Sequence, residues 1–155
     1  MSTDSTVPRP ALLLGLAGLL PSLAMLAVML ALPDWRDAAA RIGLGYGAVI
    51  ASFVGGAWWG LVAVRPDAGA RSRLLALSVL PSLIAWPALL LPPAAGLLLL
   101  AMLFAALLPT DARLRREGIA PAWWMGLRRP LSLGMALMHG AAAALLVLSA
   151  TRPPG

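Results

Sequence analysis

The sequence predicts an all-α fold: a polytopic membrane protein that forms a bundle of five transmembrane helices, with a short interfacial helix between helices 4 and 5. Composition is the first reason, because 61% of the 155 residues are hydrophobic, 12% are charged and the mean hydropathy is +0.88. Soluble domains are nearer half apolar and a quarter charged. Spacing is the second reason. A bilayer core of about 30 Å needs roughly 20 apolar residues per helix, and five stretches of about that length lack Asp, Glu, Lys and Arg.

These stretches predict five spans and one transmembrane domain over residues 11–150, between an N-tail (1–10) and a C-tail (151–155). We expect every formal charge to lie in a connection or a tail. The first span is longer than a signal-peptide core, so we expect a retained helix. In chain order, the predicted spans are 11–32, 42–64, 74–91, 92–109 and 131–150.

The first and third spans share the tetrapeptide Leu-Pro-Ser-Leu, at residues 20–23 and 80–83. Pro21 and Pro81 each remove a helical hydrogen bond, so both helices are expected to kink. The second span is predicted to be the central helix, because small residues recur at every fourth position and let other backbones approach. They form two adjoining lines: Gly43, Gly47, Ala51 and Gly55, and Ala48, Ser52, Gly56 and Gly60.

The fourth span is opened by a Pro-Pro pair at residues 92–93, where a helix tolerates proline. After this span, Thr110 and Asp111 resemble a helix N-cap and Gly118 a helix end. Residues 121–129 are then expected to form the interfacial helix, with Trp123 and Trp124 facing acyl chains and the arginines facing headgroups. Anionic lipids are the partners expected at Arg113, Arg115, Arg116, Arg128 and Arg129.

The arginines predict orientation, because cytoplasmic connections of membrane proteins are enriched in basic residues. One predicted face carries nine arginines, from the N-tail and from the connections over residues 65–73 and 110–130. The other face carries Arg36, Arg41 and Arg152. The count predicts a cytoplasmic N-terminus and a C-terminus on the outside.

Few residues in the sequence could catalyse a reaction or bind a metal. Cysteine is absent, which removes disulfides, thiolate metal sites and thiol catalysis. No carboxylate is expected inside the membrane, and His139 alone cannot provide a bis-histidine haem or a zinc site. The sequence therefore predicts no cofactor, no metal and no enzyme. The apolar composition also excludes a soluble enzyme and a nucleic-acid partner, despite a net charge of +6.

A candidate ligand cleft or polar core follows from helix register. With a rise of about 1.5 Å per residue, the polar side chains of four helices are predicted to gather between the inner boundary and the midplane. Unsatisfied polar groups are costly in hydrocarbon, so these side chains should point toward one another. They form either a closed hydrogen-bonded core or a cavity roofed by Trp59 and bounded by Arg128. The candidates are Ser22, Tyr46, Ser52, Trp58, Trp59, Ser82, His139 and Arg128.

The segment from Tyr46 to Gly60, YGAVIASFVGGAWWG, resembles the signature of a family of small multi-span membrane proteins, the transmembrane protein 69-like family. The two Leu-Pro-Ser-Leu segments and the Pro-Ala-Trp-Trp segment at residues 121–124 fit the same pattern. Family members often have His at the position of Trp58 and Tyr at that of Trp124. The resemblance implies a bacterial inner-membrane or mitochondrial protein of unknown function, and supplies no reaction or substrate.

Two functional hypotheses stay open. The first is a non-enzymatic inner-membrane protein that binds a lipid-like ligand or supports a membrane complex, with a protein partner or a second copy in the membrane. The alternative is a small transporter or channel subunit, acting as an oligomer, whose kinked first and third helices line a path between the leaflets. Against the alternative, no charged residue is expected within the spans and no inverted repeat is visible.

Overall fold

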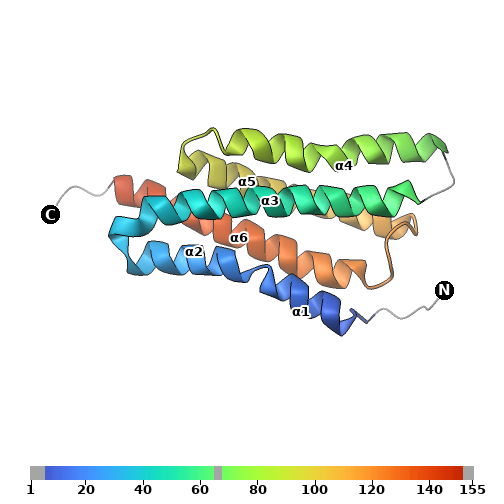
Figure 1. The fold of residues 1–155 in the computed structure, drawn as a ribbon, viewed down its shortest axis with the longest axis horizontal. Coiled ribbons are helices and arrows are strands. Elements are labelled where there is room, and N and C mark those ends of the chain that lie inside the picture. The colour runs from blue at the N-terminus through green and yellow to red at the C-terminus, as the bar shows by residue number, and fades with distance from the viewer. Residues whose placement is uncertain (1–5, 65–67, 152–155) are drawn as a thin grey trace.

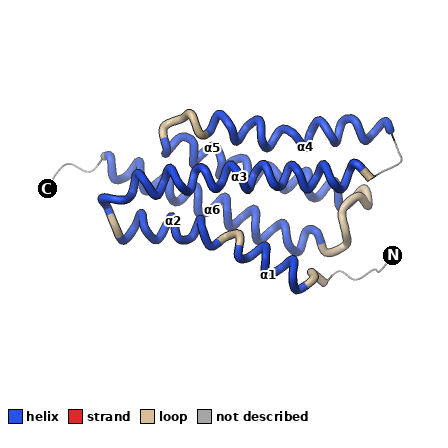
Figure 2. Tube along the Cα trace, viewed as in Figure 1, coloured by secondary structure: helices blue, strands red, loops and turns tan. Residues whose placement is uncertain are grey.

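The computed structural model describes residues 6–64 and 68–151, with the side chains of residues 68–71 left aside. Within these residues the protein is entirely helical, which confirms the predicted all-α class (Figures 1 and 2). A 3-10 turn, Pro33–Trp35, precedes α3. The helices are α1 (Arg9–Ala17), α2 (Leu20–Ala31), α3 (Arg36–Ala63), α4 (Ala68–Ala88), α5 (Pro93–Arg116) and α6 (Trp124–Ala150).

Within the described residues, four stretches are long and apolar enough to cross a membrane. Ser72–Ala88, in α4, is apolar but shorter, so a fifth crossing remains a prediction. Figure 1 shows α1 and α2 as one broken rod beside the others, all roughly parallel to the long axis of the molecule. The four stretches are Arg9–Ala31, Pro33–Ala63, Pro93–Arg116 and Trp124–Ala150.

Helix α3 is the central helix, as its small residues predicted, because it packs against α2, α4, α5 and α6. Its first line of small residues is buried. At Gly55 an added Cβ would overlap the carbonyl oxygen of Ser78, so the backbone of α4 lies directly on α3 there. The second line is corrected in part: Gly56 and Gly60 are exposed, and nothing lies within 4 Å of an added Cβ at either. Only one of the two lines is therefore covered at this end of α3.

The proline-induced kink predicted in the first span is a complete break. Helix α1 ends at Ala17, and Pro21 occupies the first turn of α2, where its missing N–H is tolerated. The third span is shifted from its predicted bounds, because α4 ends at Ala88. Residues 89–91 instead turn back, and their N–H groups donate to the carbonyls of residues 86–88.

The connection between the last two spans differs most from prediction. Helix α5 does not stop at residue 109 but continues through Pro109, Thr110 and Asp111 to Arg116. The predicted helix end at Gly118 is confirmed by its positive φ of 66°. A separate interfacial helix is not confirmed, because residues 124–129 form the first turns of α6, which passes through Pro130 to Ala150.

Several predictions concern residues outside the described part of the chain. These residues are 1–5, 65–67 and 152–155. They include most of the two predicted tails, as well as Arg65 and Arg152 of the arginine count. The expectation that every charge lies in a connection or a tail is wrong, because charged residues lie within helices. Helix α3 contains Arg36, Asp37 and Arg41, and α5 and α6 contain Asp111, Arg113, Arg115, Arg116, Arg128 and Arg129.

Candidate functional site

A buried polar cluster joins α3, α5 and α6 around Asp111. Oδ1 of Asp111 accepts hydrogen bonds from Nε1 of Trp58 and Nε1 of Trp124, both at 2.8 Å. Oδ2 accepts from Nε of Arg128 at 2.9 Å, which makes an ion pair. Nη2 of Arg128 donates to Oγ of Ser132 at 3.0 Å. We call these five residues the Asp111 cluster.

Helical periodicity places Asp111 and Arg128 inside the bundle. On α5, Asp111 follows the buried Phe104 and Leu107 and precedes the buried Leu114, at spacings of three or four residues. On α6, Arg128 begins a buried row with the same spacing. That row is Arg128, Ser132, Met135, His139 and Ala142.

Asp111 and Arg128 are both buried, and the cluster pairs their opposite charges. Asp111 is 0% exposed and Arg128 is 8% exposed. A buried charge is tolerated only when it is paired and hydrogen-bonded. Asp111 accepts three such bonds, one from an opposite charge, so its carboxylate is well satisfied. The cluster therefore fixes α6 against α3 and α5.

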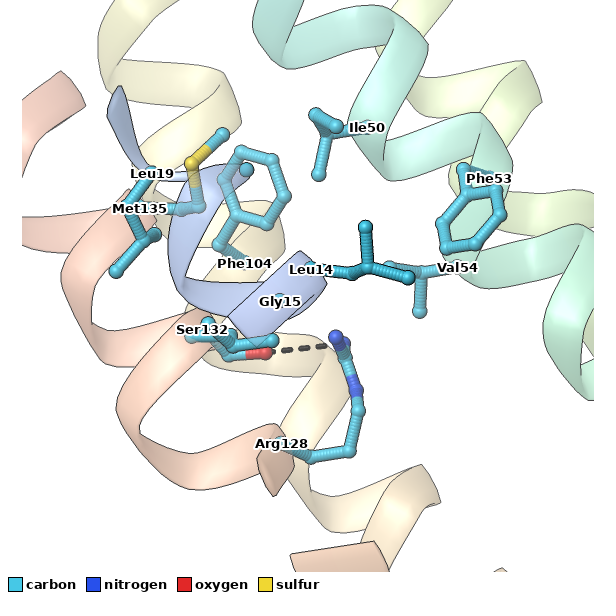
Figure 3. A pocket seen from close by; sticks show the side chains of 12 residues that line it. Leu14, Gly15, Leu19, Ile50, Phe53, Val54, Phe104, Arg128, Ser132 and Met135 are labelled. Atoms are coloured by element: carbon cyan, nitrogen blue, oxygen red, sulfur yellow. Dashed lines mark hydrogen bonds between the residues drawn. The ribbon is translucent and has the colours of Figure 1, made fainter. Parts of the chain in front are cut away.

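A cavity adjoins this cluster, between α1, α3 and α6. It consists of a lobe of about 120 Å³ and one of about 320 Å³, which we call the α1 cavity. Among the described residues that line it, Arg128 alone is charged, and Figure 3 shows that side chain reaching toward Leu14 and Val54. The mouth opens sideways, because Leu14 is 75% exposed and Phe53 is 72% exposed. The residues common to both lobes are Leu14, Gly15, Phe53, Val54, Arg128 and Leu131.

The structure brings two predicted site residues, Trp58 and Arg128, into the Asp111 cluster. This corrects the expectation that Arg128 faces headgroups: its pairing with Asp111 turns it into the bundle. It also corrects the expectation of no buried carboxylate. Tyr46 lies near the cavity, where its hydroxyl donates to the carbonyl of Gly18 at the break between α1 and α2, at 2.6 Å.

Ser22 and His139 are both fully buried and both contact Met135. Oγ of Ser22 donates to Sδ of Met135 at 3.4 Å, and Nδ1 of His139 lies 2.8 Å from the Met135 carbonyl oxygen. His139 also packs on Phe104, with ring centroids 5.5 Å apart. An added Cβ at Gly47 would overlap Nε2 of His139, so the ring faces α3 closely. These contacts form a packed core beside the cavity.

Three predicted residues do not join the site. Ser52 donates to the carbonyl of Ala48 in its own helix. Trp59 is exposed and lines neither lobe, so it does not roof the cavity. Ser82 is half-buried on α4, outside the lining of both lobes.

Asp111 and Ser132 are not among the site residues predicted from the sequence, and Trp124 is predicted there to contact lipid. The signal that could have found Asp111 and Ser132 is their spacing from apolar residues on the same helical face. Among the described residues, no group of three His, Cys, Asp or Glu side chains could hold a metal ion.

Comparison with known proteins identifies the family. A family model described as "Protein of unknown function (DUF3429)" matches residues 7–144, which include the whole Asp111 cluster. Transmembrane protein 69 of Xenopus tropicalis is 35% identical over 137 residues, covering 81% of this chain and 50% of that relative. The chain thus spans about half the length of this curated relative, and no solved structure matches. On this evidence the chain is a membrane protein that belongs to the transmembrane protein 69-like, DUF3429 family.

Proposed function

We propose that this protein is a non-enzymatic inner-membrane protein that binds a lipid-like ligand in the α1 cavity. The observation that carries the proposal is a largely apolar cavity with a lateral mouth and a single charged side chain in its wall. Small-molecule sites are mostly apolar with a few well-placed polar groups. The ligand's chain would lie against Leu14, Phe53 and Leu131, and its polar end against Arg128.

The size of the cavity supports a chain or ring rather than a single water. An engineered apolar cavity of about 150 Å³ binds benzene, and the larger lobe is about 320 Å³. Helix α1, which forms one wall, has no buried residue and packs chiefly on α6. Because α1 makes so few contacts, it could move aside and let a ligand exchange with the bilayer.

Within this proposal, α4 makes the fifth crossing, the N-terminus is cytoplasmic and the C-terminus is outside. The arginine count supports this orientation. Anionic lipids would then bind at the inner surface to Arg113, Arg115, Arg116 and Arg129, which are exposed or half-buried. Arg128 is excluded from this set because it pairs with Asp111.

The test compares two alanines on α3. Ala57 lines the larger lobe, whereas Ala63 is exposed and lines neither. Ala57→Phe should fill the cavity, and Ala63→Phe is the matched control. After purification in mild detergent, extraction and mass spectrometry should recover a lipid from the wild type and Ala63→Phe but not from Ala57→Phe. Equal recovery from all three would contradict the proposal.

Support of a membrane complex is a second role compatible with this bundle. The exposed Gly56 and Gly60 on α3, together with the half-buried Ser52, would let a protein partner or a second copy pack closely. Crosslinking in native membranes tests this role, and a monomer without crosslinked partners would contradict it.

The alternative function, a small transporter or channel subunit, is favoured by one observation. Asp111 is a fully buried carboxylate, and ionisable residues inside membranes often mark ion pathways. Proteoliposomes that contain a pH-sensitive dye should then show proton flux that Asp111→Asn abolishes. If vesicles without protein leak protons as fast as vesicles with the wild-type protein, proton transport is excluded.

A further inference from the structure

We infer that the ligand of the α1 cavity has an electrically neutral head group whose carbonyl-type oxygen accepts hydrogen bonds from Arg128 and Ser132. This inference rests on the proposed function and names the chemical class of the ligand. It depends on the donors that face the cavity and on the charge balance of its wall.

Arg128 has an unused donor group at the cavity. Its Nε donates to Asp111 and its Nη2 to Ser132, while no hydrogen bond within the described residues engages Nη1. Arginine has five N–H donors, and Arg128 uses one on Nε and one on Nη2, so three remain. Nη1 is not one of the described side-chain nitrogens that are buried without a partner, so it is accessible from outside the packed core. An acceptor oxygen on a ligand could therefore reach it.

Ser132 offers a second donor at the same place. Its Oγ accepts the hydrogen bond from Arg128, so the hydroxyl proton is left to donate elsewhere. Figure 3 shows Ser132 and the Arg128 guanidinium side by side at the cavity wall. Two neighbouring donors suit a carbonyl oxygen, which has two lone pairs.

The charge balance selects a neutral head group over an anionic one. Asp111 already neutralises Arg128 at 2.9 Å, and the other described residues that line the two lobes are uncharged. A carboxylate or phosphate would therefore add an uncompensated negative charge to an apolar cavity. Burial of such a charge costs far more than burial of a hydrogen-bonded dipole. An ester, ketone or amide carbonyl satisfies both donors without this cost.

The test uses two probes with the same chain and different head groups. Methyl 9,10-dibromostearate is neutral, and 9,10-dibromostearate at pH 9 is anionic. Bromine quenches tryptophan fluorescence, and Trp124 lines the larger lobe. With the full chain in detergent, we expect the ester to quench at roughly tenfold lower concentration than the carboxylate, because of the buried-charge cost.

Three variants test which residues bind the probes. Ser132→Ala removes one donor but keeps the ion pair, so it should weaken ester binding severalfold and carboxylate binding less. Ser149→Ala is the matched control, since Ser149 is on the same helix, outside both lobes, and donates to Leu146. Ala57→Phe should remove the saturable part of the quenching by both probes, and the exposed Trp59 and Trp86 account for the part that remains.

The outcomes separate this inference from the proposed function. Equal or tighter binding of the carboxylate, lost in Ala57→Phe, would overturn the neutral head group while leaving a ligand cavity. Unchanged ester binding in Ser132→Ala would overturn the assigned donor. Equal quenching in wild type and Ala57→Phe would show adventitious contact with the additive only, and would overturn both proposals.

Discussion

Asp111 of α5 and Arg128 of α6 lie 17 residues apart in the chain and form an ion pair, with 2.9 Å between Oδ2 and Nε. The pair closes the helical hairpin that turns at Gly118. It is flanked by two tryptophans that donate to the same oxygen of Asp111. The arrangement fixes three helices at one end of the bundle and places a charged side chain in the wall of the α1 cavity.

Removing one charge of this ion pair while keeping the other should destabilise the bundle strongly. Asp111→Asn keeps the side-chain shape but leaves the Arg128 charge without its counter-charge. Loss of one member of a buried pair costs about 3–5 kcal/mol. We expect a decrease of that order in the free energy of unfolding, measured by denaturant titration in detergent.

The control is a surface pair in the same hairpin. Arg113 and Glu117 lie 2.7 Å apart, and their side chains are 55% and 38% exposed. Glu117→Gln should change stability by less than about 1 kcal/mol, because surface pairs contribute little. The double variant Asp111→Asn/Arg128→Met should recover part of the loss. A similar loss for Glu117→Gln and Asp111→Asn would contradict a special role for the buried pair.

Adjacent glycines on α3 should respond in opposite ways to the same substitution. Gly55→Ala would place a Cβ on the Ser78 carbonyl and force α4 away, at a cost of about 1–3 kcal/mol. Gly56→Ala meets nothing within 4 Å and should leave stability unchanged or slightly raised. Thermal melts of the two variants give the comparison. Equal stability would mean that the α3–α4 contact is looser than described.

Sequence periodicity predicted the central helix well and the site only in part. Gly43, Gly47 and Gly55 could be read from the sequence because close helix packing needs small residues at every fourth position. Asp111 was missed because a charge near the end of an apolar stretch also marks the end of a span. Its spacing from Leu107 and Leu114 was a second signal, but only the folded bundle supplies the three donors that make its burial tolerable.

The walls of the cavity could not be predicted from sequence for a different reason, although a cavity bounded by Arg128 was one of the two alternatives. They depend on where α1 lies relative to α2 across the break at Gly18, and the sequence predicts a kink there without the direction in which α1 turns. Packing of α1 on α6 through Gly15 and Leu131 determines the opening. Trp59 was predicted to roof the cavity only from its distance along the helix from the inner membrane boundary. In the structure it lies on the exposed face of α3.

Topology is the next prediction, and it depends on five crossings. C-terminal fusions should give active alkaline phosphatase and no green fluorescence. Fusions after Arg116 should give the reverse, because the α5–α6 hairpin would be cytoplasmic. Green fluorescence at both positions would mean that α6 does not cross.

The last prediction concerns α1 as the movable wall of the cavity. Three observations support movement: α1 has no buried residue, it packs chiefly on α6, and it is joined to α2 by the break at Gly18. The carbonyl of Gly18 is held by Tyr46, which would act as a fixed point at this hinge. The chain has no cysteine, so introduced pairs can be crosslinked without interference. An added Cβ at Gly15 lies 2.9 Å from Cδ1 of Leu131.

Because Gly15 faces the side chain of Leu131, we expect Gly15→Cys/Leu131→Cys to form a disulfide on oxidation and to fix α1 against α6. The tether should slow exchange of the brominated ester severalfold, and reduction should restore the wild-type rate. Each single cysteine variant, oxidised in the same way, is the control. Because the tether keeps the native contact, ligand already bound should be retained. Unchanged exchange in the fully crosslinked protein would show that ligands reach the cavity without movement of α1, between α3 and α6.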